Sequence, residues 1–486
     1  MRIGHKSPAA LQGAHFMKKN YEIDMSQGKL FGKLISFAIP LLLSGMLQLA
    51  FNMADLIVVG RFAGELSLAA VGSNGSLVAL ILNVLMGLGT GTSILVSRYF
   101  GAKDEKHLLD AVQTTVIVAI IGGVIFGGAG IALSGVLLNA MKTPDTVLPL
   151  AKIYLRIYFC GLPVMITYNF SSAALRAVGD SRRPLVFLTI AGVLNVILNL
   201  IFVIVFHMGV AGVAIATVAS QCVSCVLTLR CLIRSKTMCR LVLKPFRFSW
   251  KAFGEIVRIG LPAGIQGSLF SISNVLIQSS INYFGDMTMA GNAAAQSIEA
   301  FLFVSMDAMN QAAVASVSQS MGAREYQRTR KAVRMCLAME FVVATALGLI
   351  TVAFRRQLVG IYTSEEAAIQ AGCTRIIILG MVYFTNGMQH MMTGVMRGLG
   401  YSILPTCITL MGICGFRVIY IFTYFAAHKT LAVLYASYPI SWVLTIAAQL
   451  ICYFSLRKRA YEKNEQKYLQ RLAEEASAEN TDPIGA

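Results

Sequence analysis

The sequence predicts an all-α polytopic membrane protein, with twelve transmembrane helices in two six-helix bundles related by a pseudo-twofold axis along the membrane normal. Of its 486 residues, 56% are hydrophobic and 13% are charged, about half of the ~25% charged residues usual in soluble domains. The apolar residues recur in stretches of roughly 20 or more, the length of a helix that crosses ~30 Å of hydrocarbon. A similarity between the two halves of the chain completes the case.

Twelve apolar stretches are each predicted to form one membrane-spanning helix. In chain order they are centred near Leu43, Leu80, Ile120, Leu162, Asn195, Ser220, Ser271, Val304, Ala344, Tyr383, Gly415 and Leu444. Within the second and third of these stretches, the segments 87–93 and 120–135 are rich in glycine and other small residues. Small residues let helices approach each other closely.

The two halves of the chain match at an offset of 221 or 222 residues. FAIPLLLSGMLQLAFN (37–52) pairs with RIGLPAGIQGSLFSISN (258–274), and YFGAKDEKHLLDAV (99–112) pairs with SMGAREYQRTRKAV (320–333). Because each half has an even number of spans, the second begins on the same side of the membrane as the first, as in a parallel repeat. Two such bundles around a cavity can rock and expose it to each side in turn, which favours a transporter.

The charge distribution predicts the topology and the domain boundaries. Most of the 41 Lys and Arg residues lie in the two tails and in alternate loops, so both termini are expected in the cytoplasm of a cell-membrane protein. This topology accounts for the net charge of +18 without a nucleic-acid partner. The predicted parts are a disordered N-terminal tail (1–28), an N-terminal six-helix lobe (29–234), a cytoplasmic linker (235–251), a C-terminal six-helix lobe (252–456) and a cytoplasmic C-terminal tail (457–486).

The cations that this topology does not explain are few. Arg417 is the only one placed clearly within a span, and three arginines on the outer side fit the charge rule least: Arg355, Arg356 and Arg375.

An aspartate in the first apolar stretch is the most informative residue of the first half. Gln48, Asn52 and Asp55 are spaced i, i+4, i+7 and therefore share one helical face. Polar side chains in membrane helices face the bundle interior or a wet cavity. Alternatively, Asp55 lies beyond the hydrocarbon, as a cap or a solvated group. For Asn52 and Gln48, hydrogen bonding between helices is as good an explanation as contact with a ligand.

Two later spans of the first half carry polar pairs of their own. Asn195 and Asn199 are spaced i, i+4 on the fifth span, and Thr217 and Gln221 on the sixth. A carboxylate together with amide and hydroxyl oxygens suits a hard cation such as Na⁺, or a proton. The sequence therefore predicts a cation-binding site formed by Asn52, Asp55, Asn195, Asn199 and Thr217, with Asp55 as the candidate Na⁺ ligand.

The second half has polar residues in three spans, which we predict to line a substrate cavity together with Gln48: Asn274, Gln278, Glu299, Asp307, Asn310 and His390. Two acids on one membrane helix make such a cavity attractive to cations. The competing interpretation is that Glu299 or Asp307 forms a structural ion pair with Arg417 or another span. His390 can titrate or can simply be a satisfied packing residue.

The residue patterns of enzymes are missing. The six histidines have no ligand spacing, and Cys222 and Cys225 form a CxxC inside an apolar helix without a second pair. There is no phosphate-binding GxxxxGK[ST] motif. We therefore expect no enzyme activity and no cofactor apart from the coupling ion, so that energy comes from an ion gradient.

Five motifs together resemble the multidrug and toxic compound extrusion (MATE) family of antiporters. They are NMADLIVVGRFAG (52–64), LVSRYFGAKD (95–104), ALRAVGDSRRP (174–184), GVAGVAIAT (209–217) and SVSQSMGAR (316–324). The resemblance covers the chain from about Lys29 to Leu456. It implies cation-coupled export of bulky, often cationic, organic compounds by alternating access.

The resemblance also implies particular site residues. The first-span Asp of the family matches Asp55, its span-five Asn matches Asn195, and its span-six Thr matches Thr217. The sequence departs from the family at Asn199, where a second Asp is common, and so this site has one carboxylate rather than two. In another branch of the family the acids lie in the C-terminal lobe, a part that Glu299 and Asp307 could play.

The leading hypothesis is thus an antiporter coupled to Na⁺ or H⁺ that exports amphipathic or cationic organic compounds. The alternative is a flippase for a lipid-linked sugar or peptidoglycan precursor, which should display several Arg or Lys residues inside the spans. The expected partners are small organic molecules and the lipid bilayer, and the expected oligomeric state is a monomer.

Overall fold

The described part of the chain is entirely helical. The computed structural model describes residues 21–141, 143–242 and 247–481, and within these ranges it contains α-helices and short π-helical turns but no strand. The all-α prediction is confirmed. Parts of the predicted N-terminal tail (1–20), linker (243–246) and C-terminal tail (482–486) lie outside the described residues.

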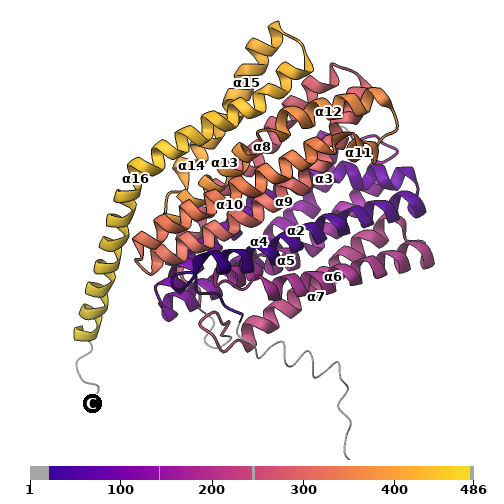
Figure 1. Cartoon of the computed structure of the whole chain (residues 1–486). Coiled ribbons are helices and arrows are strands. Elements are labelled where there is room, and N and C mark those ends of the chain that lie inside the picture. The colour runs from indigo at the N-terminus through magenta and orange to yellow at the C-terminus, as the bar shows by residue number, and fades with distance from the viewer. Residues whose placement is uncertain (1–20, 142, 243–246, 482–486) are drawn as a thin grey trace, which may run out of the picture. The chain divides into compact units, whose positions relative to one another are not determined.

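The first half consists of six long helices, two of which continue into π-helical turns. They are α2 (Leu30–Val58) with η1 (Val59–Ala63), α3 (Glu65–Gly101), α4 (Glu105–Ala140), α5 (Leu148–Ala177), α6 (Arg182–Leu200) with η2 (Ile201–Val205), and α7 (Gly209–Arg234). Figure 1 traces them from indigo to magenta.

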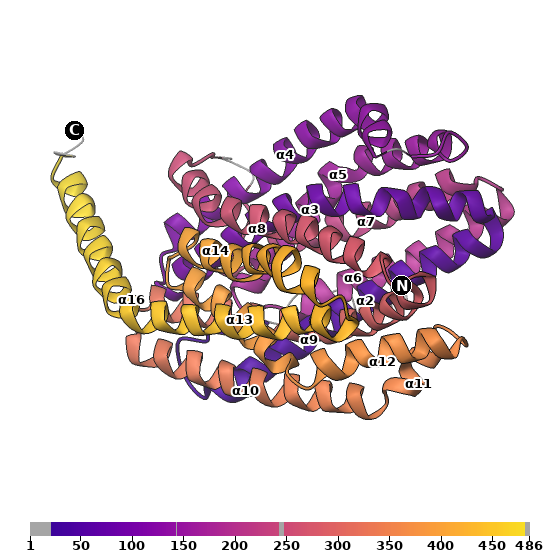
Figure 2. The ribbon, with the colours of Figure 1, turned by 90° about the horizontal axis from the view of Figure 1, so that it is seen from above.

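The second half is more interrupted. Its elements are α8 (Trp250–Asn282), α9 (Asp286–Gly322), α10 (Tyr326–Ala353), α11 (Arg355–Gly360), α12 (Glu366–Gly380), α13 (Tyr383–Gly398), α14 (Ile403–Thr409), η3 (Leu410–Gly415), α15 (Phe416–Tyr420), η4 (Ile421–Phe425) and α16 (Leu431–Thr481). α10 and α12 lie side by side (Figures 1 and 2).

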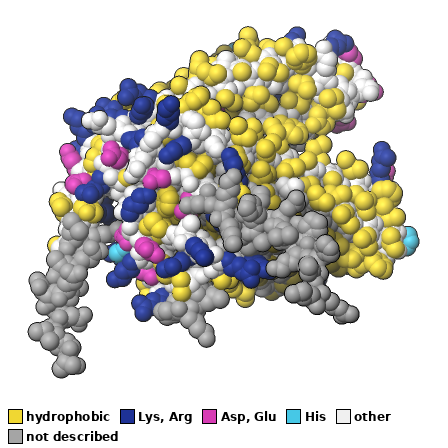
Figure 3. All heavy atoms as spheres, turned by 60° about the horizontal axis from the view of Figure 1, so that its bottom comes forward, with side chains coloured by type: hydrophobic (Ala, Val, Ile, Leu, Met, Phe, Trp, Pro, Cys, Tyr) yellow, Lys and Arg dark blue, Asp and Glu magenta, His cyan; other side chains and the backbone are white. Residues whose placement is uncertain are grey.

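The described helices fit the twelve predicted spans. Ten are long and apolar enough to cross a membrane, and the count is eleven when the pair α12–α13, bent by 55°, is taken as one broken span. The remaining predicted span is α8, a 33-residue helix whose many serines, glycines and glutamines make it less apolar. Figure 3 shows wide areas of hydrophobic side chains on the molecule's surface, as expected where helices face lipid, and Lys and Arg gathered in another area.

The chain divides into two compact units. Of the described residues, unit 1 comprises 21–24, 35–100, 104–141, 143–242 and 247–265, and unit 2 comprises 25–34, 101–103 and 266–481. The predicted lobe boundaries, which place all of α8 in the C-terminal lobe, stay predictions.

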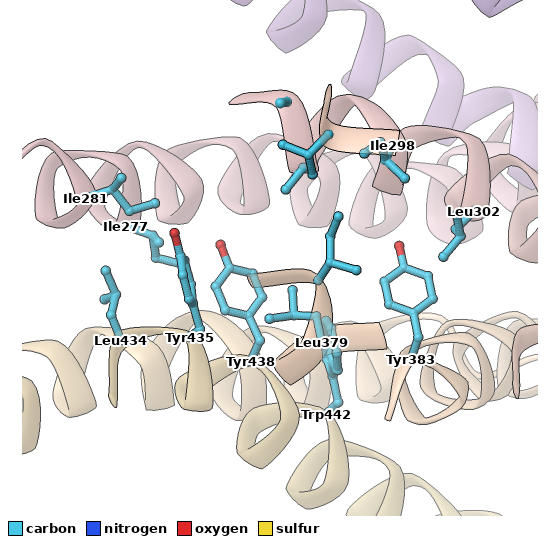
Figure 4. Packing of buried hydrophobic residues seen from close by; sticks show 14 of the residues in the cluster. Ile277, Ile281, Ile298, Leu302, Leu379, Tyr383, Leu434, Tyr435, Tyr438 and Trp442 are labelled. Carbon is cyan, nitrogen blue, oxygen red and sulfur yellow. The ribbon is translucent and has the colours of Figure 1, made fainter. Parts of the chain in front are cut away.

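Each unit buries its own hydrophobic core. In unit 2, residues of α8 and α9 such as Ile277 and Ile298 pack against Leu379 of α12 and against Tyr435 and Trp442 of α16 (Figure 4). Burial of aromatic side chains of this size contributes a large share of the packing energy of a core.

Four glycines allow α3 and the first half of α8 to pack in close contact within unit 1. A Cβ atom at Gly87 would lie 2.2 Å from the backbone nitrogen of Gly264, and one at Gly91 would lie 2.4 Å from the carbonyl oxygen of Ile256. A Cβ atom at Gly260 would lie 2.5 Å from the Cα atom of Leu88. Gly87 and Gly91, and likewise Gly260 and Gly264, have the spacing of small residues at close helix crossings in membranes.

This packing predicts that the Gly264→Val substitution destabilises the protein. The added atoms would meet the backbone of α3, and overpacking of this kind costs about 1–3 kcal/mol. We expect a lower Tm for the purified protein in detergent. The matched control is Gly254→Val on the same helix, because nothing lies within 4 Å of a Cβ atom there. Equal Tm values for the two variants would contradict the close packing.

Candidate functional site

Four predicted cation-site residues come together in unit 1. Asp55 of α2 accepts a short hydrogen bond from the Nδ2 atom of Asn199 on α6. The same Nδ2 atom lies 3.3 Å from the Oδ1 atom of Asn195, and Nδ2 of Asn195 lies 3.4 Å from the Oγ1 atom of Thr217 on α7. We call Asp55, Asn195, Asn199 and Thr217 the unit-1 polar cluster. It connects three helices by side-chain hydrogen bonds.

Asp55 lies inside a helix rather than at its end. The helical chain of α2 continues through η1 to Ala63, so that about 12 Å of helix follows Asp55 at 1.5 Å per residue. The carboxylate is half-buried and bonds to another helix. This geometry disfavours the alternative in which Asp55 is a cap.

The backbone around the unit-1 polar cluster is locally irregular. The π-helical turns η1 and η2 begin within four residues of Asp55 and Asn199, respectively. π-helical turns are rare and frequently occur at functional sites. Between these turns and α7, Val58, Val59, Val203 and Val213 form a small apolar core. The three helices that share the polar cluster are thus held together by apolar packing directly beside it.

A glycine allows α6 to approach α2 near the unit-1 polar cluster. A Cβ atom at Gly192 would lie 1.8 Å from the Cε2 atom of Phe51. Gly192 precedes Asn195 by one turn and Phe51 precedes Asp55 by one turn, so that this contact fixes the distance across which Asn199 reaches the carboxylate.

One acceptor of the unit-1 polar cluster has no partner. Asn199 is 0% exposed, and its Oδ1 atom is buried with no hydrogen-bond partner. A buried unsatisfied amide oxygen costs free energy. Rotating the Asn199 amide by 180° would bring Oδ1 beside the oxygens of Asp55 and Asn195. That arrangement is repulsive by itself but favourable around a cation, so the donor set fits a bound cation.

The other polar residues predicted on α2 and α7 lie differently. Gln48 and Asn52, on the turns before Asp55, are exposed in the structure. Gln221 accepts a hydrogen bond from Ser224 on its own helix, at 3.3 Å. In the described part of the chain, no group of three or more His, Cys, Asp or Glu side chains is arranged to hold a metal ion.

In unit 2, Glu299 pairs with an arginine. The Nε and Nη2 atoms of Arg375 on α12 donate to the two carboxylate oxygens of Glu299 on α9, at 2.8 and 2.7 Å. Nη1 of Arg375 donates to Oδ1 of Asn292 at 2.8 Å, and Nδ2 of Asn292 lies 3.2 Å from Oε1 of Gln278. The predicted residues Gln278 and Glu299, both partly buried, therefore belong to one network through the buried Asn292 and Arg375.

Aromatic rings surround this ion pair. The guanidinium of Arg375 lies 5.5 and 5.1 Å from the ring centres of Tyr435 and Tyr438, and the Tyr383 hydroxyl lies 3.4 Å from the backbone oxygen of Glu299. Figure 4 shows the hydroxyl groups of these three tyrosines pointing toward the helices opposite. Cation–π contacts of this kind stabilise a desolvated guanidinium.

The structure corrects the sequence-based placement of Arg375. The sequence counts it among the outer-side cations and leaves Arg417 as the only clear intramembrane one, whereas Arg375 is 2% exposed within α12, part of a candidate span. The bent pair α12–α13 extends from Glu366 to Gly398, so the candidate span includes Arg375. The proposed pairing of Glu299 with another span is correct, but the partner is not Arg417. Arg417 instead donates to Ser441 at 3.1 Å and lies 4.0 Å from the ring centre of Tyr438.

The remaining polar residues predicted in unit 2 form a separate group. The Nε2 atom of His390 lies 3.4 Å from Oδ1 of Asp307 and 3.2 Å from Nδ2 of Asn310. Gln311 donates to the other carboxylate oxygen of Asp307 at 2.7 Å, and the Asp307 side chain is 41% exposed. Asp307 is therefore accessible to a solute, in contrast to Glu299. Asn274 is exposed.

Sequence reasoning overlooked three residues of unit 2. Asn292 precedes Glu299 by seven residues on α9 and therefore shares its helical face, a spacing that could have revealed it. Arg375 was counted with the loops. Glu340 interrupts the apolar run CLAMEFVVA (336–344) much as Asp55 interrupts the first one, and the structure buries it fully.

Comparison with known proteins agrees with this architecture. The chain is 29% identical over 392 residues to YpnP of Bacillus subtilis (strain 168), described as a probable multidrug resistance protein, a match that covers 80% of this chain and 87% of that protein. It is 26% identical over 420 residues to YoeA of the same organism, also described as a probable multidrug resistance protein, covering 84% and 90% of the two chains.

A solved structure has the same fold. It is described as the outward-facing conformation of a multidrug resistance MATE family transporter of the MOP superfamily, and its TM-score is 0.84 at 21% identity, over 92% of this chain and all of that one. This fold and its long apolar helices are those of a multi-pass membrane protein. The MatE family model matches residues 40–201 and 262–423, and the chain belongs to this family.

The ion pair in unit 2 leads to a stability prediction. Replacing Arg375 by Met would leave Glu299 uncompensated in the interior, and breaking a buried pair in this way costs about 3–5 kcal/mol. We expect a correspondingly lower free energy of unfolding for the purified protein in detergent. Adding Glu299→Gln should restore most of the loss, because no buried charge then remains. A double variant no more stable than Arg375→Met would contradict a structural role for the pair.

Proposed function

We propose that this chain is an ion-gradient-driven exporter of bulky amphipathic or cationic organic compounds, in which Na⁺ or H⁺ binds at Asp55. The observation that carries the proposal is the hydrogen-bonded contact of this carboxylate with α6, next to a buried amide oxygen without a partner. The relatives described as probable multidrug resistance proteins support the same class of substrate.

Cation binding at the unit-1 polar cluster would change the contacts among three helices. With the carboxylate charged and no ion bound, Asn199 donates to Asp55 and thereby holds α6 to α2. Protonation of Asp55 weakens this charge-assisted bond, and Na⁺ would turn the amide oxygen of Asn199 inward. Either event alters the link between α2 and α6 beside the π-helical turns. An ion that prefers one of the two conformations can then drive the exchange of substrate between the two sides.

The group formed by Asp307, His390 and Phe303 in unit 2 is suited to an organic cation. Asp307 is an accessible carboxylate, and the exposed ring of Phe303 lies beside His390, its centroid 5.3 Å from that of the imidazole. An organic cation gains both from a nearby carboxylate and from an aromatic face. We place cationic substrates near this group in unit 2, and the coupling ion in unit 1.

The flippase alternative gains no support from the corrected arginine assignment. Arg375 is bound to Glu299 and Asn292, and Arg417 is buried beneath Tyr438. Neither guanidinium is presented to a pyrophosphate head group. Both termini in the cytoplasm and a monomeric state remain part of the proposal.

The first test is efflux of a fluorescent cationic dye from proteoliposomes under an imposed Na⁺ or H⁺ gradient. We expect gradient-dependent efflux by the unchanged protein and its loss in Asp55→Asn, which keeps the shape but removes the charge. Asp145→Asn, an exposed acid in the loop before α5, is the matched control and should transport normally. Efflux retained by Asp55→Asn would refute coupling at Asp55, and no gradient-driven efflux by the unchanged protein would refute the exporter proposal.

A second test adds a charge to the same site. Asn199→Asp supplies a second carboxylate next to Asp55, and one extra charge at ~4 Å contributes enough energy to strengthen Na⁺ binding roughly tenfold or more. We expect half-maximal efflux at a correspondingly lower Na⁺ concentration, or direct ²²Na⁺ binding where the unchanged protein shows little. Asn139→Asp, which adds a carboxylate at an exposed position near the end of α4, serves as the control. Unchanged Na⁺ dependence in Asn199→Asp would place the ion elsewhere.

A further inference from the structure

Glu340 is a fully buried acid without a partner. It lies in the middle of α10 at 0% exposure, and neither of its carboxyl oxygens has a hydrogen-bond partner. None of the ion pairs among the described residues includes it. It differs in this respect from Asp55, which has an amide donor, and from Glu299, which has an arginine.

The carboxyl group is held against a glycine of the broken span. A Cβ atom at Gly387 of α13 would lie 1.9 Å from the Oε1 atom of Glu340, so the absence of a side chain there makes room for the carboxyl group. Two turns further along α10, Gly348 likewise packs against the backbone of Gly380, the last residue of α12. α10 therefore contacts the 55° bend between α12 and α13 on both sides through glycines.

The groups that face Glu340 are all neutral or already paired. Cys336 on its own helix and Tyr383 of α13 interact with it electrostatically. The other helices packed against α10 are α9, α11 and α12, and Glu299 of α9 and Arg375 of α12 neutralise each other. On α11, Arg356 pairs with Glu366, and Arg355 donates to the backbone oxygen of Val352. One turn beyond Gly387, His390 pairs with Asp307 rather than with Glu340.

An ionised carboxylate in this position would have neither a hydrogen-bond donor nor an ion-pair partner among the described side chains. Charges buried without a partner neutralise themselves instead of remaining ionised. Glu340 therefore carries a proton in this conformation. Even the protonated group leaves its hydroxyl unsatisfied, so this conformation does not give the carboxyl group its best environment.

We propose that Glu340 is a proton-binding site of unit 2, separate from Asp55, which gives up its proton when the bend between α12 and α13 rearranges. Movement of α13 along α10 would take Gly387 away from the carboxyl group and admit water. Tyr383 links proton release from Glu340 to the rearrangement of the bend, because it is the first residue of α13 and its hydroxyl contacts the backbone of Glu299. Only the use of this proton in transport rests on the proposed function; the proton site itself does not.

The proton site is tested with an apolar carbodiimide, which reacts with protonated carboxyl groups, on the full-length protein in a bilayer. Mass spectrometry of the peptide containing Glu340 measures the labelling. We expect labelling at neutral pH that falls severalfold as the pH is raised, and the same dependence in Asp55→Asn. Absence of labelling at every pH, or labelling that does not change with pH, would overturn the proposal, because an exchanging site must show both access and titration.

Transport then separates this site from the first one. Glu340→Gln imitates the protonated group in size and charge and should keep the Tm of the unchanged protein. We expect it to flatten the pH dependence of dye efflux, while the surface variant Glu366→Gln retains the normal profile. Labelling at Glu340 without any efflux would refute the proposed function and leave the proton site standing. A normal pH profile in Glu340→Gln would refute the role of this proton in transport.

Discussion

An acid inside an apolar bundle must be either compensated or protonated, and three acids of this fold lie in three different environments. Asp55 is compensated by an amide hydrogen bond, Glu299 by a bidentate arginine, and Glu340 by none of the described side chains. Under the proposed function, these differences in compensation correspond to different roles of the three acids. A fully paired acid such as Glu299 fixes its helices, whereas a partly satisfied one can exchange a proton or bind an ion at low cost.

Close packing at glycines brings these acids to their partners. Gly192 lets α6 approach Phe51 so that Asn199 reaches Asp55, and Gly387 leaves space for the carboxyl group of Glu340. Helices in lipid gain little from the hydrophobic effect between them, so small residues that allow backbone contact are a main source of association. The same residues therefore stabilise the bundle and set the geometry of its ionisable groups.

Much of this arrangement was predictable from local sequence patterns. The half-chain repeat is confirmed by the two matches of the family model, and the i, i+4 pairs indicated that Asn195, Asn199 and Thr217 would lie near Asp55. Partners on distant helices were not predictable in this way. The pairing of Glu299 with Arg375 depends on tertiary packing and on the bend between α12 and α13. Hydrophobic periodicity also does not predict the π-helical turns.

The repeat conserves the fold of the two halves but not their chemistry. The family matches are offset by 222 residues, and at that offset Asp55 corresponds to Ile277 and Asn195 to Arg417. Ile277 is buried in the hydrophobic core of unit 2, and Arg417 stacks on Tyr438, so the position of the unit-1 polar cluster has become a packing region in unit 2. The acids of unit 2 lie instead on α9 and α10. Two halves with equivalent ion sites would respond to the same cation in the same way. Because their acids differ in position and in compensation, the two halves are not equivalent in their ionisable groups, although they share one fold.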